Sequence, residues 1–130
     1  MCYKCCATIF FSYNDGMEIL YVEHDIQIPF ANIIYFEHFS KYDNYLQRVT
    51  FIHTTTTTYI THKKIKELYT VLDTSIFIMP HQSYIVNMQY IKAFSQLYLL
   101  LDNDIRIPIS IKRSMYLRKQ FLAYIKERSV

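Results

Sequence analysis

The chain has 130 residues, 52% of them hydrophobic, which predicts one globular domain that can bury a substantial core. Its single Gly excludes the glycine-rich phosphate loops of P-loop and Rossmann proteins. The formal net charge of +3 permits nucleic-acid binding without demonstrating it, because the arrangement of the charge matters more than the sum.

All three cysteines, Cys2, Cys5 and Cys6, lie at the extreme N-terminus. A C-x-x-C-C run without a second cluster of ligands is a poor zinc site, so reduced thiols are the simpler interpretation and a redox or metal role is the alternative. The apolar run at 7–11 is too short to span a membrane, and it lacks a signal-peptide cleavage pattern. We therefore expect a cytoplasmic protein with no membrane partner, no metal and no cofactor.

Strand-like composition dominates the first half of the chain. The turn signal Asn14-Asp15-Gly16 predicts a hairpin from about residue 9 to residue 22. Threonines fill positions 54–58, and these β-branched residues favour a strand with one wet face; an array of functional hydroxyl groups is the alternative. The other expected elements are strands at 18–22, 25–28, 33–36 and 45–52, a short helical or irregular link at 30–32, and a polar loop or frayed strand end at 37–44.

A helix is expected at 62–72, with Thr61 as its cap. Its apolar face comprises Ile65, Leu68, Val71 and Leu72. Three lysines, Lys63, Lys64 and Lys66, lie elsewhere on its surface. Such lysines are usually only solvated, and a contact with nucleic acid is the alternative.

A polar triplet, His81-Gln82-Ser83, stands between an apolar approach at 77–80 and an apolar anchor at 84–86. Polar side chains between buried anchors are held rigidly and point outward, which is how a fold presents them to a partner. The remaining expected elements are a strand at 93–101, a hairpin turn at 102–104, an alternating strand at 105–109 and a terminal helix at 111–127 capped by Ser110. The apolar face expected for that helix comprises Leu117, Phe121, Leu122 and Ile125.

Four motifs in this order resemble the LytTR family of DNA-binding domains, the output modules of many bacterial response regulators. The motifs are Ile28-Pro29 followed by Ile33-Ile34-Tyr35-Phe36-Glu37, then Ile65-Lys66-Glu67-Leu68, then Phe77 to Asn87 with Ile91-Lys92, and last Ile107-Pro108-Ile109-Ser110 with Lys112-Arg113. The resemblance covers roughly Leu20 to Phe121.

The resemblance implies a mainly β fold with short helices (α+β): small antiparallel sheets, one mid-chain helix and a C-terminal helix. Residues 18–130 would form the DNA-binding domain, and 1–17 an N-terminal extension with a candidate extra strand. A sequence-specific transcriptional regulator is implied. Its loops would read successive grooves of double-stranded DNA, with a homodimer on tandem half-sites. No receiver domain fits in the chain, so we expect a stand-alone domain or an excised module controlled by expression, self-association or another protein.

The family's three contact regions carry over as Lys41 and Asn44, then His81, Gln82 and Ser83, then Ser110, Lys112 and Arg113. The residue chemistry agrees independently, since Gln suits adenine, and Lys and Arg suit guanine or phosphate. Serine hydroxyls suit phosphate oxygens. Two alternatives stay open: Ser110 as only a helix cap, and His81 as a structural residue that holds its own loop.

The chain departs from the family pattern at Met79, Pro80, Gln82 and Ile111. Three of these changes, at 79, 82 and 111, remove positive charge, so binding should depend less on phosphates, or the DNA site should differ. The alternative function is a protein-interaction module: a scaffold of this kind that has lost its DNA contacts and binds another regulator, for example by offering a sheet edge. The histidines form no HExxH or Cys/His arrangement and no carboxylates are paired for acid–base work, so we expect no enzyme.

Overall fold

The computed structural model describes residues 13–14, 17–23, 26–39 and 49–128. Its strands are β1 (Tyr13–Asn14), β2 (Met17–Val22), β3 (Ile26–Pro29), β4 (Ile33–Phe39), β5 (Val49–Thr54), β6 (Thr58–Thr61), β7 (Phe77–His81), β8 (Tyr84–Asn87), β9 (Ile91–Phe94), β10 (Tyr98–Leu101) and β11 (Arg106–Pro108). Its helices are α2 (Ile65–Val71), α3 (Ser114–Arg128) and the 3-10 turns η2 (Phe30–Asn32), η3 (Met88–Tyr90) and η4 (Ile111–Arg113). The predicted mainly β class with short helices is confirmed.

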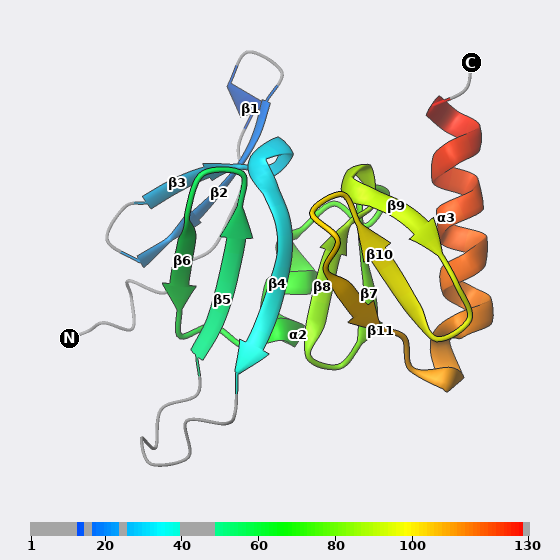
Figure 1. Ribbon diagram of the computed structural model, residues 1–130. Helices are drawn as coiled ribbons and strands as arrows, with labels where there is room; N and C mark the ends of the chain where they lie inside the picture. The colour runs from blue at the N-terminus through cyan, green and yellow to red at the C-terminus, as the bar shows by residue number, and fades with distance from the viewer. Residues whose placement is uncertain (1–12, 15–16, 24–25, 40–48, 129–130) are drawn as a thin grey trace.

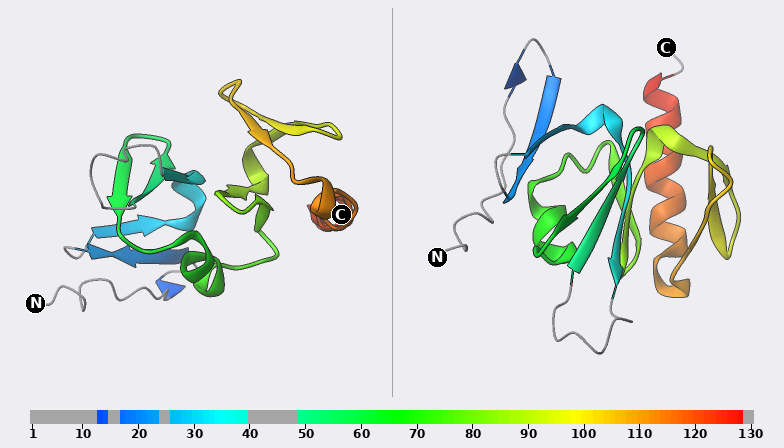
Figure 2. Two further views of the ribbon diagram at one scale, coloured as in Figure 1. Left: turned by 90° about the horizontal axis from the view of Figure 1, so that it is seen from below. Right: turned by 60° about the vertical axis from the view of Figure 1, so that its left-hand side comes forward.

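Three antiparallel sheets make up the described fold (Figure 1). The largest has the strand order β6-β5-β4-β8-β7, and the two smaller ones have the orders β1-β2-β3 and β11-β10-β9. Both views of Figure 2 place β1 to β3 and α3 on opposite sides of the molecule. The five-stranded sheet therefore stands between an N-terminal hairpin layer and a C-terminal layer of sheet and helix.

The strands β4, β7 and β8 are apolar on both faces because each face meets a different core. Ile85 and Val86 are neighbours in β8 and both fully buried, yet Ile85 packs in the core beneath α2, whereas Val86 packs in the core beneath α3. Successive side chains of a strand point to opposite faces, so one apolar run can supply both cores. This explains the unbroken apolar stretches on either side of the polar triplet.

The threonine run is not a strand, contrary to the prediction. Thr54 ends β5 and Thr58 begins β6, so the residues between them form the turn of a hairpin. The Thr54 hydroxyl donates to the Thr57 carbonyl at 2.6 Å and accepts from the Thr57 amide at 3.0 Å. Threonine side chains can satisfy a turn in this way, and here that local bonding overrides the β propensity of the residue.

Three helix and strand limits also differ from the prediction. Helix α2 begins at Ile65 rather than at 62, and the expected cap Thr61 is instead buried in β6. The expected strand at 93–101 is divided into β9 and β10, because the Ser95 hydroxyl accepts from the amides of Leu97 and Tyr98 and closes a turn. The terminal helix begins with the 3-10 turn η4 before α3.

The apolar face expected for α3 is only half correct. Leu117 is buried and Phe121 is partly buried against the second core. Leu122 and Ile125, however, are 57% and 44% exposed. Leu122 follows Phe121 directly and so points about 100° away from it around the helix, which moves it out of the contact with β7 and β9.

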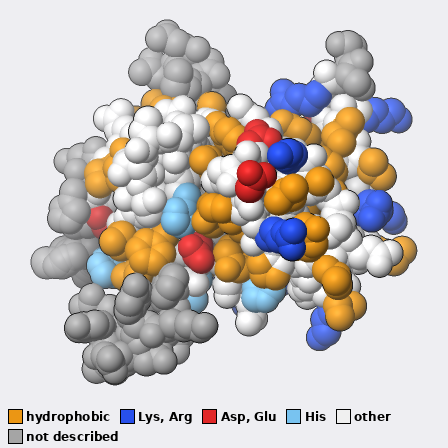
Figure 3. Space-filling view, viewed as in Figure 1, with side chains coloured by type: hydrophobic (Ala, Val, Ile, Leu, Met, Phe, Trp, Pro, Cys, Tyr) orange, Lys and Arg blue, Asp and Glu red, His pale blue; other side chains and the backbone are white. Residues whose placement is uncertain are grey.

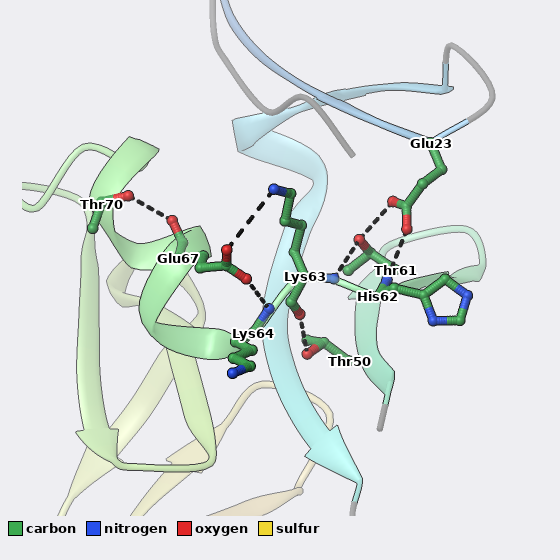
Figure 4. Close-up of polar contacts among 8 residues, drawn as sticks. All are labelled: Glu23, Thr50, Thr61, His62, Lys63, Lys64, Glu67 and Thr70. Carbon is green, nitrogen blue, oxygen red and sulfur yellow. Dashed lines mark hydrogen bonds and ion pairs between the residues drawn. The ribbon is translucent and has the colours of Figure 1, made fainter. Parts of the chain in front are cut away.

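A buried carboxylate fastens the N-terminal hairpin to the end of β6 (Figure 4). Glu23, which follows β2, accepts a hydrogen bond from the Thr61 hydroxyl at 2.6 Å and another from the His62 amide at 2.7 Å. Burial alone would raise the pKa of Glu23, but these hydrogen bonds and the charge of nearby His62 lower it overall. Folding therefore favours the ionised form of Glu23.

Replacing Glu23 by Gln should reduce stability at neutral pH by about 1–3 kcal/mol, the usual contribution of charge-assisted hydrogen bonds. Because the pKa of Glu23 is lowered on folding from its ordinary 4.5, its contribution is present above pH 4.5 and is lost as the pH falls through the folded value. Urea unfolding of both proteins between pH 7 and pH 3 should show the difference shrinking with acidity. Glu127→Gln, a change to an exposed carboxylate on α3, is the control. A pH-independent difference for Glu23→Gln would contradict the assignment.

Candidate nucleic-acid interface

Two of the three predicted contact regions come together in the fold. The turn Gln82-Ser83 joins β7 to β8, and residues 110–113 join β11 to α3; Figure 1 shows both at the lower end of the molecule. The Ser110 amide donates to the Pro80 carbonyl at 2.9 Å, which ties the two segments through their main chains. One open hollow of about 520 Å³ is lined by His81, Gln82, Ser110, Ile111, Lys112 and Arg113.

His81 has a structural contact within its own turn. Its Nδ1 atom accepts a hydrogen bond from the Ser83 amide at 3.1 Å, and its ring meets the Tyr84 ring edge-on with centroids 5.8 Å apart. Since the amide must be the donor, Nδ1 carries no proton, and the neutral ring is protonated at Nε2. This geometry supports the structural interpretation of His81, although the ring also lines the hollow.

Gln82 and Lys112 are the exposed polar members of the hollow. Gln82 lies at the tip of the β7–β8 turn, and Lys112 lies in the middle of η4. Each is carried by a short, hydrogen-bonded turn, so the main chain beneath it is well defined. An amide and an ammonium group in one hollow can bind the polar edges of bases or phosphate oxygens.

Ser110 and Ser83 are placed differently from what the sequence predicts for a helix cap and for a residue of the contact region. The Ser110 side chain makes no capping hydrogen bond to η4, so the fold does not use it as the predicted cap; only its carbonyl accepts, from the Arg113 amide at 2.9 Å. Ser83 does not line the hollow with its neighbours His81 and Gln82. The Ser83 carbonyl accepts instead from the His38 amide at 2.8 Å and extends the pairing of β8 with β4.

Arg113 is partly buried rather than fully presented to solvent. Its Nη1 atom is buried and has no hydrogen-bond partner within the described part of the chain. Burial raises the pKa of the Tyr69 hydroxyl, and the Arg113 guanidinium nearby acts in the opposite direction. The guanidinium is therefore within electrostatic reach of Tyr69, while the residue still lines the hollow.

The first predicted contact region, with Lys41 and Asn44, lies outside the described residues. On the face of the molecule drawn in Figure 3, the Lys and Arg side chains of the described residues gather on the half that carries β9 to β11 and α3.

Among the described residues, no three His, Cys, Asp or Glu side chains form a group that could hold a metal ion. None of the described helices is both long enough and apolar enough to span a membrane.

Sequence reasoning gave no role to Asn87, the last residue of the third motif. Asn87 is fully buried, and its amide nitrogen donates to the carbonyls of Ile33 at 2.9 Å and Phe30 at 3.3 Å. Its Oδ1 atom accepts from the Gln89 amide at 2.9 Å. Asn87 thus joins the end of β8 to η2 and β4, and a polar residue that closes a buried apolar strand was the available signal.

Comparison with known proteins agrees with this fold. A family model described as the LytTr DNA-binding domain matches residues 23–122. Among solved structures, the LytTr DNA-binding domain of a Bacillus cereus protein described as a methyl-accepting/DNA response regulator is similar, with a TM-score of 0.62 and 24% identity over 87% of this chain and 95% of that one. That likeness concerns the fold alone, and the search of curated proteins finds no match. Because the family model spans most of the sequence, the chain belongs to the LytTR family of DNA-binding domains.

Proposed function

We propose that the chain is a sequence-specific transcriptional regulator that acts in the cytoplasm and reads successive grooves of double-stranded DNA with loops. The observation that carries this proposal is the shared hollow, which Gln82 lines from one turn and Lys112 from another. The hydrogen bond from the Ser110 amide to the Pro80 carbonyl ties the two segments together. Two recognition turns at a fixed separation suit a ligand with a fixed repeat, and DNA is such a ligand.

The proposed roles follow from the chemistry of each group. Gln82 pairs with the N6 and N7 atoms of adenine, and Lys112 contacts guanine O6 and N7 or a phosphate. Arg113 and the Ser110 hydroxyl contact phosphates at the rim, and Ser83 gives a further phosphate contact. His81 holds the β7–β8 turn in shape. Lys41 and Asn44 form the first contact region of the domain at 18–130, with 1–17 as an extension, and two copies bind tandem half-sites as a homodimer.

The test is selection of a bound duplex from a random pool, followed by a salt titration. The logarithm of the binding constant should fall linearly with the logarithm of salt concentration, with a slope of about 0.9 per neutralised phosphate. Lys112→Ala should weaken this slope by about one if Lys112 contacts a phosphate, and should relax the sequence preference if it contacts guanine. An unenriched pool together with salt-independent affinity would rule out the proposal.

The second candidate is a protein-interaction module that binds another regulator. It is favoured by a groove of about 310 Å³ beside the hollow, whose lining includes Leu97, Ile111 and Met115. These side chains are 70%, 85% and 76% exposed, respectively. Neighbouring exposed apolar side chains are typical of protein-binding surfaces. A complex with a protein partner should survive the loss of the Gln82 and Lys112 side chains, whereas DNA binding should not.

A further inference from the structure

Ile111 is an apolar side chain in an otherwise polar and basic hollow. Its side chain is 85% exposed, which is the highest exposure among the large apolar residues that the structure describes. Ile111 lies on the border between this hollow and the groove that it shares with Leu97 and Met115. Of these three exposed apolar residues, it is the one that also lines the hollow with Gln82 and Lys112.

The local backbone explains why Ile111 leaves the core. Ile107 and Ile109 alternate along the preceding segment and are 1% and 7% exposed, so both pack in the core beneath α3. After the extended Ser110, the chain turns into η4, and the alternation ends. Ile111 is thereby turned outward at the first position of η4. Its truncation should leave the buried core intact.

The polar groups beside Ile111 indicate which apolar ligand it meets. In the major groove, the C5-methyl group of thymine is the apolar feature of the base edges, and in an A·T pair it shares that edge with the adenine N6 and N7 atoms, on the far side of thymine O4. Gln82, in the same hollow, has the amide that suits those adenine atoms. An amide for adenine and a branched apolar side chain for the methyl group together match an A·T pair or two adjacent A·T pairs.

We propose that Ile111 is a specificity-determining residue that contacts a thymine methyl group in the bound DNA. This inference rests on the proposed function, because it requires the hollow to face the major groove. Transfer of one methyl group out of water is worth about a fourfold change in binding constant. Ile111 thus selects thymine by its methyl group, without a hydrogen bond.

The test uses the full chain and a duplex recovered by selection. Each thymine is replaced in turn by deoxyuridine, which lacks only the methyl group, and binding is measured for the wild type and for Ile111→Ala. For the wild type, affinity should fall about fourfold at one or two thymines. For Ile111→Ala, affinity for the unmodified duplex should fall by a similar factor, and the same thymines should no longer respond to methyl removal.

Ile60→Ala is the matched control, since Ile60 is 55% exposed on β6 and is not among the residues that line the hollow. It should bind like the wild type and keep the wild-type response to deoxyuridine. If every thymine responds equally in the wild type and in Ile111→Ala, or none responds in either, the inference is overturned while DNA binding stands. If no duplex is bound at all, the proposed function itself fails.

Discussion

Replacing Gln82 and Lys112 together by Ala is expected to weaken binding to the selected duplex by at least about 30-fold, with no loss of stability. A good side-chain contact with a base contributes about 1–3 kcal/mol to discrimination, so the loss of two such contacts multiplies to this factor. Both side chains are exposed, and the main-chain bond between Pro80 and Ser110 involves neither of them. Fluorescence anisotropy with the duplex measures the affinity, and thermal unfolding by circular dichroism measures the stability.

A matched control changes the same residue types elsewhere. Gln89 in η3 and Lys66 in α2 are both exposed and are not among the lining residues of the hollow. Gln89→Ala with Lys66→Ala removes the same charge and should retain nearly all of the affinity. The Gln82 and Lys112 variant also separates the two candidate functions, because a complex with a protein partner should survive it. Unchanged DNA affinity in this variant would exclude these two residues as the readers of the site.

Replacing Asn87 by Ala should destabilise the domain by about 3 kcal/mol or more. The change removes two bonds in the buried interior, to the carbonyls of Ile33 and Phe30, and a third to the part-buried amide of Gln89. Each buried polar group that loses its partner costs about 1–3 kcal/mol. Denaturant unfolding at neutral pH gives the difference, and the affinity of the remaining folded protein for DNA should change little.

Asn103→Ala is the matched control for Asn87. The Oδ1 atom of Asn103 also accepts from the amide two residues ahead, that of Ile105 at 3.2 Å, but in the exposed turn between β10 and β11. Water can replace the side chain there, so the change should cost less than about 1 kcal/mol. Equal losses for the two variants would show that burial is not what makes Asn87 important.

Much of the fold could be predicted because its signals are local or periodic. The turn at 102–104 and the helical link at 30–32 depend on neighbouring residues, and both occur as expected. The grouping of Gln82 with Lys112 was inferred from the family resemblance, since the two positions are far apart in the sequence. No periodicity could have brought them together, and the Pro80–Ser110 bond that does so involves only main-chain atoms.

Two of the differences from the prediction have a common physical origin in side chains that bond to their own backbone. The hydroxyls of Thr54 and Ser95 each close a turn inside a stretch whose composition favours a strand. Composition cannot show which of two competing hydrogen-bond partners a hydroxyl will choose. The exposure of Leu122 was missed for a different reason, because how α3 rolls against the sheet depends on the whole second core.

The main-chain bond between Pro80 and Ser110 also bears on how such a domain can acquire new targets. The side chains at 82, 111 and 112 can be exchanged without altering the distance between the two turns that carry them. A family built on this link could change which bases it prefers while keeping the spacing between the base steps that it reads. A library randomised at these three positions should therefore yield variants whose preferred sequences differ in letters but share one length.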